Sequence, residues 1–189
     1  MVAVEANFQN RQLPAPHRDP GSIKYRLDVV ACNAADVVGS IGGWLYDRVR
    51  SGWDVNVLLA QECDDRPLRI LGMQAMNFDP QILSANTECA ARGLAVSADM
   101  FASDVRIRQQ VVAALNRWMT EVILWHDDWP LTVGHRTTTV QHVLSGAARA
   151  FKHHALAAAG VLAVVGPTET LRSDMKTYLP VDSELIPVG

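Results

Sequence analysis

The chain has few of the residues that build disulfide scaffolds, nucleic-acid interfaces or membrane anchors. Its 189 residues include only three cysteines, Cys32, Cys63 and Cys89, and no Cys-x-x-Cys pair. Widely spaced cysteines of this kind argue against a disulfide framework and predict a reducing compartment. Lysine and arginine form no run, and the formal net charge is -3. The electrostatic footprint of a nucleic-acid binder is therefore missing, and we expect no nucleic-acid partner.

Segments that would carry the chain to a membrane or anchor it there are also missing. The most apolar stretch, Ala155 to Val165, is interrupted by Gly160 and is far shorter than the about 20 residues that a membrane-spanning helix needs. The first residues lack the basic-then-apolar pattern of a secretory signal. We therefore expect a cytoplasmic protein without a membrane partner. Walker-type phosphate loops and Gly-x-Ser-x-Gly elbows do not occur either, so no motif names a cofactor.

Composition divides the chain into a central domain and two peripheral segments. Residues 1–22 carry three prolines among polar residues without hydrophobic periodicity, which predicts a flexible N-terminal arm. Residues 167–189 have a similar composition and predict a C-terminal tail. In residues 23–166, strand and helix patterns alternate. This rhythm is typical of a single α/β domain, a three-layer sandwich with a largely parallel sheet.

An early segment has the pattern of a βαβ unit. Residues 25–32 (YRLDVVAC) are apolar and β-branched enough for a buried strand. Asn33 is a good helix N-cap, Asp36 places negative charge in the first turn, and Gly52 follows the last periodic residue. Residues 53–60 (WDVNVLLA) predict a second strand. Two strands joined through a helix of this length run parallel.

Three glycines lie inside the expected helix. Gly39, Gly42 and Gly43 each cost about 1 kcal/mol relative to alanine in a helix, so they need a structural or functional reason. Either the helix packs closely on its neighbours, or a ligand approaches the helix near its start. The residues of this hypothetical ligand site are Cys32, Asn33, Asp36, Gly39, Gly42, Gly43 and Glu62.

The same segment resembles the first βαβ unit of Rossmann-type dinucleotide-binding proteins, above all in its passage from helix to second strand, residues 50–58 (RSGWDVNVL). The resemblance implies a Rossmann-like topology, with Glu62 in the place of the ribose-binding acid. The loop after the first strand departs from the family, because residues 32–36 (CNAAD) stand where the fingerprint has glycines. Asp36 would repel a pyrophosphate at the helix N-terminus. The phosphate-binding loop is therefore degenerate, and free NAD or FAD is not the expected ligand.

Further along the chain, the spacing of apolar residues predicts more strands and helices. The expected elements are strands at 68–75, 94–97 and 161–165 and helices at 79–93, from Ser103 to about Trp125, and from Thr138 to Gly160. The helix from Ser103 to Trp125 has an apolar face wider than one sheet contact needs. We expect a homo-oligomer or a protein partner to cover it. In the last helix, four basic side chains fall away from the apolar stripe and should be solvated: His142, Arg149, Lys152 and His153.

Two places carry side chains suited to catalysis. Cys32 should lie at the carboxyl end of the first strand and beside a helix N-terminus, a position that lowers the pKa of a thiol. Cysteine is also a common filler of buried sites. A second cluster, His126, Asp127, Asp128 and His135, has the imidazole and carboxylate ligands that zinc or a related metal uses. It matches no known metal spacing, and Asp127-Asp128 before Trp129-Pro130 is also typical of a turn that ends a helix, which is the favoured interpretation.

The sequence thus has clear fold signals and broken catalytic signatures. The leading interpretation is a non-catalytic Rossmann-like module that acts through protein–protein interaction or self-association. One alternative is a protein that binds a nucleotide or another small molecule in the crevice after the first strand. The other is an enzyme with a cysteine nucleophile or a metal site. A fold by itself does not choose among these three functions.

Overall fold

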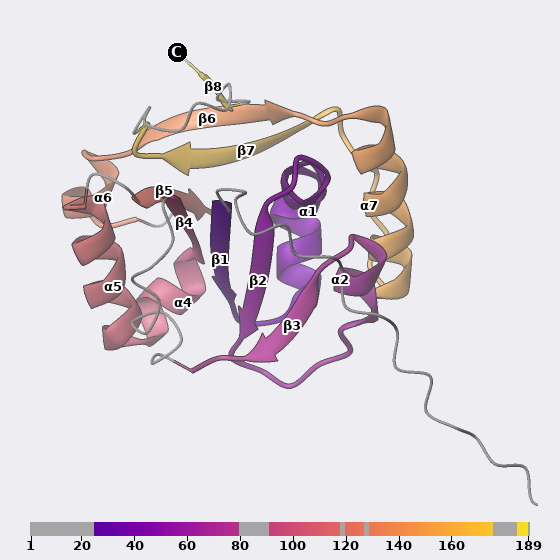
Figure 1. The fold of residues 1–189 in the computed structure, drawn as a ribbon, viewed down its shortest axis with the longest axis horizontal. Helices are drawn as coiled ribbons and strands as arrows, with labels where there is room; N and C mark the ends of the chain where they lie inside the picture. The colour runs from indigo at the N-terminus through magenta and orange to yellow at the C-terminus, as the bar shows by residue number, and fades with distance from the viewer. Residues whose placement is uncertain (1–24, 80–90, 118–119, 127–128, 176–184, 189) are drawn as a thin grey trace, which may run out of the picture.

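The protein folds around one eight-stranded, mostly parallel sheet (Figure 1). The computed structural model describes residues 25–79, 91–117, 120–126, 129–175 and 185–188. The strands are β1 (Tyr25–Ala31), β2 (Asp54–Leu59), β3 (Gln74–Asn77), β4 (Ala91–Ser97), β5 (Thr120–Trp125), β6 (Thr138–Val143), β7 (Thr168–Ser173) and β8 (Leu185–Pro187). Their order across the sheet is β3-β2-β1-β4-β5-β7-β6-β8. Pairs from β3 to β5 are parallel, and pairs from β5 to β8 are antiparallel.

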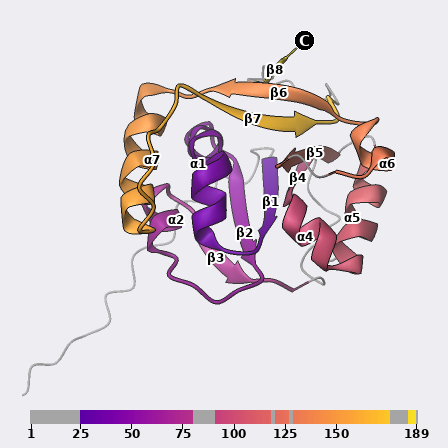
Figure 2. The same ribbon diagram turned by 180° about the vertical axis from the view of Figure 1, so that it is seen from behind.

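Helices lie on both sides of the sheet. They are α1 (Ala34–Arg50), α2 (Arg66–Ile70), α4 (Ala98–Ser103), α5 (Val105–Leu115), α6 (Leu131–Gly134) and α7 (Gly146–Ala158). Figures 1 and 2 show α1, α2 and α7 together on one side and α4, α5 and α6 on the other. Val29 and Val30 point to opposite faces of β1, so each belongs to a different hydrophobic core. Within the described ranges, no helix has the length and apolarity to cross a bilayer.

The first three elements follow the sequence prediction. α1 begins where expected because the Asn33 side chain accepts the N–H of Asp36 at 2.9 Å, which satisfies one of the open donors of the first turn. Asp36 in the first turn and Arg48 in the last complement the helix dipole. The chain then turns at Gly52, whose φ of 91° favours glycine. Local signals were therefore sufficient for β1, α1 and β2.

The expected helix from Ser103 to Trp125 is wrong in its second half. α5 ends at Leu115, and the chain then enters β5 in the middle of the sheet. Residues 122–124 are fully buried. Because both faces of this strand are covered, its apolar run does not alternate and cannot be told from a buried helix by periodicity. The wide helix face that suggested self-association or a protein partner is therefore partly a buried strand.

The expected helix from Thr138 to Gly160 also combines two elements. Residues 138–143 form β6, and α7 starts after Ser145, whose side chain caps it. His142 therefore lies on a strand, where it is 3% exposed, and Lys152 on α7 is 6% exposed. Neither of these two side chains is solvated as expected, whereas Arg149 and His153 are exposed as expected. His142 and Lys152 are buried because α7 packs against α1 and β6 runs beside β7.

Other boundaries differ as well. The expected strand at 68–75 contains the end of α2 and the start of β3, and the expected strand at 161–165 is irregular chain. Of the expected helix at 79–93, residues 80–90 lie outside the described residues, and residues 91–93 belong to β4. The expected arm at 1–22 also lies outside them. The expected tail at 167–189 supplies β7 and β8, so the end of the chain completes the sheet.

Candidate functional site

The carboxyl ends of β1, β4 and β5 lie side by side in the sheet. β1 is connected through α1 to β2 on one side and pairs with β4 on the other. Open α/β sheets bind ligands outside the carboxyl ends of their strands at such a switch in strand order. We call this place the carboxyl edge. It includes Cys32 after β1, Asp36 in the first turn of α1, Ser97 at the end of β4, and His126 after β5.

The central contact of the carboxyl edge joins Asp36 and His126. Asp36 Oδ1 lies 2.8 Å from His126 Nε2. The indole N–H of Trp125 points at both oxygens of the carboxylate, at 3.3 Å and 3.4 Å. The hydroxyl of Ser40 donates to Oδ1 at 3.1 Å. Asp36 is thus oriented by partners from α1, β5 and the residue after β5.

His126 combines an exposed ring with an unusual backbone. Its side chain is 45% exposed, whereas that of Asp36 is 15% exposed. The φ of His126 is 69°, in the left-handed region that residues other than glycine seldom adopt. The indole N–H of Trp129 donates to the His126 carbonyl oxygen at 2.8 Å and supports this conformation. Such backbone strain often accompanies functional sites, and the imidazole of His126 is here partly exposed to water beside the Asp36 carboxylate.

Cys32 lies at the same edge, but its surroundings oppose a nucleophilic role. Burial raises the pKa of the Cys32 thiol, and the carboxylates of Asp99 and Asp36 raise it further. Because the thiolate is the reactive form, these surroundings hold Cys32 in its less reactive state. Cys63, in the loop after β2, accepts the N–H of Ala34 at 3.5 Å. Cys89 lies outside the described residues.

Two of the three glycines of the hypothetical ligand site face the chain itself. A Cβ on Gly43 would lie 2.5 Å from a methyl carbon of Leu144, and one on Gly42 would lie 3.1 Å from a methyl carbon of Leu71. Both positions thus allow close packing of α1. Gly39 has no neighbouring atom within 4 Å of such a Cβ. Of the other residues in that hypothesis, Asn33 caps α1 and Glu62 is exposed in the loop after β2.

The expected metal cluster is only partly described. His126 meets Asp36, and His135 is an exposed residue at the end of α6. Asp127 and Asp128 lie outside the described residues. Among the residues that the structure describes, no group of three or more His, Cys, Asp or Glu side chains could hold a metal ion. A metal at the carboxyl edge therefore stays a prediction.

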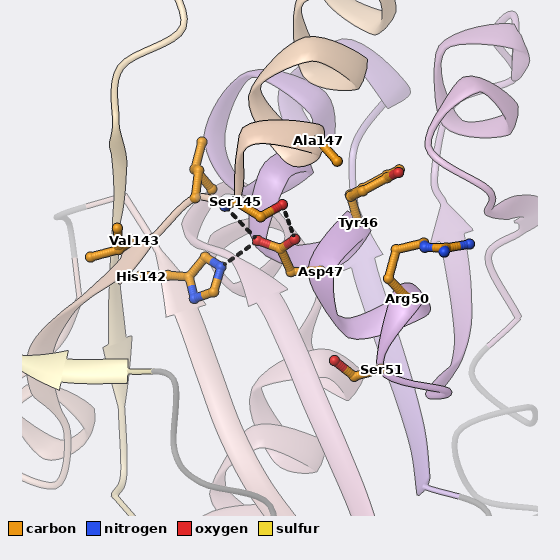
Figure 3. Close-up of a pocket in the computed structure, with 9 residues that line it drawn as sticks. Tyr46, Asp47, Arg50, Ser51, His142, Val143, Ser145 and Ala147 are labelled. Atoms are coloured by element: carbon orange, nitrogen blue, oxygen red, sulfur yellow. Dashed lines mark hydrogen bonds and ion pairs between the residues drawn. The ribbon is translucent and has the colours of Figure 1, made fainter.

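A second aspartate–histidine pair lies near the other end of α1 (Figure 3). Asp47 Oδ2 lies 2.9 Å from His142 Nε2, and the Ser145 hydroxyl donates to Asp47 Oδ1 at 2.6 Å. Ser145 also accepts the N–H of Ala148 at 3.0 Å as the N-cap of α7. These side chains line a pocket of about 600 Å³, with Arg50 beside it. The pair ties α1 to β6 and to the start of α7.

Asp47, His142 and Ser145 do not form a nucleophile relay. In such a relay the serine donates to the histidine, and the histidine to the carboxylate. Here the Asp47 carboxylate lies between Ser145 and His142 and forms a hydrogen bond with each of them. The Ser145 hydroxyl is also engaged as a helix cap. The arrangement is suited to holding three elements together.

Sequence reasoning missed the partners of both histidines. Asp36 was singled out for its charge and His126 as a metal ligand, but nothing local linked them, because they are 90 residues apart. The placement of residues 120–125 in a helix also hid the fact that His126 follows a central strand. Recognition of β5 was the signal that could have brought the two residues to one edge of the sheet.

Comparisons with known proteins locate the fold. No protein-family model and no curated protein sequence matches the chain. A solved structure of a deacetylase–teicoplanin complex, from the biosynthesis pathway of teicoplanin, has a TM-score of 0.53 and 14% sequence identity, with 78% of this chain and 97% of that chain covered. A deacetylase triple mutant from the same pathway has a TM-score of 0.48 and 14% identity, with 70% of this chain and 80% of that chain covered.

The first of these likenesses corrects the leading functional interpretation. The interpretation as a non-catalytic module that acts through protein–protein interaction or self-association is wrong, because a solved structure with a similar fold is a deacetylase. The helix from Ser103 to Trp125, which motivated the expected self-association, is not a single helix. Both observations direct attention to the carboxyl edge.

Proposed function

We propose that the chain is a hydrolase that removes an acyl group from an amide or ester, with Asp36 and His126 as its acid–base pair. The observation that carries the proposal is the 2.8 Å contact between Asp36 Oδ1 and His126 Nε2. It lies at the end of the sheet where α/β proteins bind ligands. The deacetylase with a similar fold supports acyl hydrolysis as the class of reaction.

The pair is suited to the activation of a water molecule. When its proton is on Nε2, His126 donates to Asp36, and the Nδ1 atom is then the basic nitrogen. The ring is 45% exposed, so water can reach it. As the water attacks the acyl carbonyl, its proton passes to Nδ1, and Asp36 stabilises the imidazolium. The imidazolium then gives that proton to the leaving amine or alcohol, and the products are a carboxylic acid and the free amine or alcohol.

A metal-assisted form of the same reaction is a second candidate, favoured by the same contact. Carboxylate and imidazole are both zinc ligands, but a catalytic zinc takes about three ligands from the protein. Asp36 and His126 would supply two. Any further ligand, such as Asp127 or Asp128, would come from outside the described residues. Hydrolysis measured before and after treatment with a chelator separates the two forms, because only the metal-assisted form loses its rate.

The finer architecture belongs to the same proposal. We propose a three-layer, Rossmann-like arrangement, which is supported by the β3-β2-β1-β4-β5 strand order and by hydrophobic clusters on both faces of the sheet. Residues 32–36 then stand in the place of the phosphate-binding loop in degenerate form. The negative charge of Asp36 there orients His126 and disfavours a phosphate.

Acyl release from chromogenic substrates tests the proposed reaction. The purified chain is assayed with p-nitrophenyl acetate and with 4-nitroacetanilide, an ester and an amide. We expect release of the nitroaromatic product, and a rate lower by about 10²- to 10⁴-fold in His126→Gln, because the basic nitrogen is removed. His153→Gln, an exposed imidazole on α7, is the control and should retain the parent rate. Absence of release from both substrates, or equal rates in the parent and His126→Gln, would contradict the proposal.

A further inference from the structure

A buried ion pair is attached to the middle of α1. Lys152 of α7 and Glu169 of β7 contact each other through Nζ and Oε1, and their side chains are 7% and 3% exposed. Glu169 accepts the backbone N–H of Gly43 at 2.8 Å and that of Trp44 at 2.7 Å. Lys152 donates to the carbonyl oxygen of Gly39 at 2.7 Å. The pair therefore joins three segments that are far apart in the sequence.

These contacts are unusual for the interior of a helix. In a regular α-helix, the N–H of Gly43 bonds to the carbonyl of Gly39, four residues earlier. Here that N–H donates to Glu169, and that carbonyl accepts from Lys152. Side chains normally satisfy backbone groups at helix ends, where the helix leaves them open. Lys152 and Glu169 thus form hydrogen bonds with both ends of one turn in the middle of α1. These bonds specify where that turn lies.

The sequence of α1 allows these contacts with Lys152 and Glu169. A Cβ at position 43 would lie 3.1 Å from Glu169 Oε1, tighter than about nine in ten real Cβ contacts, and would also meet a methyl carbon of Leu144 at 2.5 Å. Glycine at this position lets the carboxylate approach the helix backbone. Burial of both charges is costly, and well-packed apolar residues of similar volume often serve stability equally well. What the polar pair adds to apolar packing is direction, because hydrogen bonds weaken steeply when atoms move by less than 1 Å from their places.

The Lys152–Glu169 pair connects the elements that carry Asp36 and His126, the candidate acid–base pair. α1 carries Asp36 one turn before Gly39. β7 carries Glu169 and pairs with β5, where Leu124 is opposite Arg172. β5 leads directly into His126. A continuous frame thus runs from Asp36 along α1, through Glu169 to β7, and through β5 to His126.

We propose that Lys152 and Glu169 are positioning residues, which hold the first turns of α1 at the register that brings Asp36 to His126. The inference rests on the proposed function of that pair. Neither Lys152 nor Glu169 reaches the reacting groups. Apolar contacts of α1 set its distance from the sheet, and the ion pair sets how far it slides and turns. The contact between Asp36 and His126 depends on this setting because it is lost within a displacement of less than 1 Å.

The indole N–H of Trp125 provides a readout that needs no substrate. It lies within hydrogen-bond distance of Asp36, so its signal in a proton–nitrogen NMR spectrum reports where the carboxylate is. The signal is identified from its loss in Trp125→Phe. Asp36→Ala defines its position without the carboxylate. We expect Glu169→Gln and Lys152→Met to move the Trp125 signal toward its position in Asp36→Ala.

Arg48→Met is the matched control. Arg48 is also a buried cation on α1, and its guanidinium lies 3.8 Å from the carboxylate of Glu121. Its removal disturbs a buried ion pair of the same helix outside the turn that Lys152 and Glu169 hold. We expect Arg48→Met to leave the Trp125 signal within one linewidth. Equal shifts in Arg48→Met and Glu169→Gln would mean that any loss of stability moves α1, and the positioning role would then be wrong.

A milder variant covers the case in which Glu169→Gln does not fold. Glu169→Asp keeps the charge but shortens the side chain by one methylene, and it should shift the Trp125 signal in the same direction by a smaller amount. An unchanged signal in every folded variant of Lys152 and Glu169 would overturn the inference. The NMR result is independent of hydrolysis. If no hydrolysis is found but the Trp125 signal moves, the positioning of α1 by Lys152 and Glu169 is supported and the proposed reaction is wrong. If hydrolysis is found but kcat and the Trp125 signal are unchanged in Glu169→Gln, only the positioning role is wrong.

Discussion

The two aspartate–histidine pairs of α1 have nearly the same geometry and opposite surroundings. Asp36 and His126 meet at 2.8 Å at the start of the helix, and Asp47 and His142 meet at 2.9 Å near its end. The ring of His126 is 45% exposed and that of His142 is 4% exposed. An imidazole that exchanges protons with a substrate must be reached by it, whereas a buried one mainly fixes the elements that it joins. Surroundings, rather than the pair itself, separate acid–base chemistry from structural support.

The largest expected effect is the loss of hydrolysis when the exposed pair is broken. We expect Asp36→Asn to lower kcat for acyl release by about 10²- to 10⁴-fold, because an amide neither orients His126 correctly nor stabilises its protonated form. Asp47→Asn should leave kcat unchanged. Initial rates with p-nitrophenyl acetate measure both. Equal losses in the two variants would erase the distinction between the pairs.

The second expected effect is on stability and reverses the order of the pairs. The Asp47 carboxylate contacts His142 Nε2 and accepts hydrogen bonds from the Ser145 hydroxyl and the Ser145 N–H. We expect Asp47→Asn to lower the free energy of unfolding by about 2 to 3 kcal/mol, because hydrogen bonds to a charged group are lost where one partner is buried. Asp36→Asn should cost less, about 1 kcal/mol, because the indole of Trp125 lies at 3.3 Å and 3.4 Å from the carboxylate and His126 is exposed, so these bonds to the charge are weaker. Urea denaturation at neutral pH measures both values, and a larger loss in Asp36→Asn would refute this assignment.

The middle of α1, between the two pairs, should respond to side-chain volume at one glycine and not at the other. Gly43→Ala places a Cβ against Leu144 and Glu169, and overpacking of this kind costs about 1 to 2 kcal/mol. At Gly39 the space is open, so Gly39→Ala should be neutral or stabilise the protein by up to about 1 kcal/mol through higher helix propensity. Thermal and chemical denaturation compare the two variants. A Gly43→Ala protein as stable as the parent would show that this packing is loose.

The smallest expected effect is a change in thiol reactivity at the carboxyl edge. Burial, then Asp99 and Asp36, raise the pKa of Cys32, so its thiolate forms at higher pH than that of an ordinary cysteine. Removal of the negative charge in Asp36→Asn should lower this pKa and speed alkylation at a given pH, because the thiolate is the form that reacts. Asp47→Asn should not change the rate. Iodoacetamide labelling of the Cys32 peptide, followed by mass spectrometry from pH 7 to 10, measures the difference, and equal rates in the two variants would count against it.

Sequence reasoning succeeded where neighbouring residues decide the structure. Asn33 caps α1, Gly52 ends the turn after it, and the strands on either side lie within one or two residues of their predicted bounds. It failed where a strand is covered on both faces. Residues 122–124 have no alternation because no face of β5 meets water, so their pattern could not be distinguished from that of a buried helix.

The candidate site was predictable in its parts and not in its assembly. Asp36 and His126 were each named from the sequence, one for its charge and one as a metal ligand. Their contact was not predictable, since it requires knowledge that β5 is a central strand that pairs with β4. The contacts of the buried Lys152–Glu169 pair with α1 were even less predictable from the sequence. Glu169 lay in an expected tail, and only the three glycines of α1, Gly43 among them, signalled that something approaches the helix.

Caps, helix dipoles and apolar periodicity act over a few residues, so the first βαβ unit and the start of α1 were already specified by the order of amino acids along the chain. The pairing of each histidine with its aspartate was not. These partners are 90 and 95 residues apart, and a hydrogen bond forms only when its atoms come within about 3 Å. Strand order and helix register set that distance, and they also decide that water reaches one imidazole and is kept from the other.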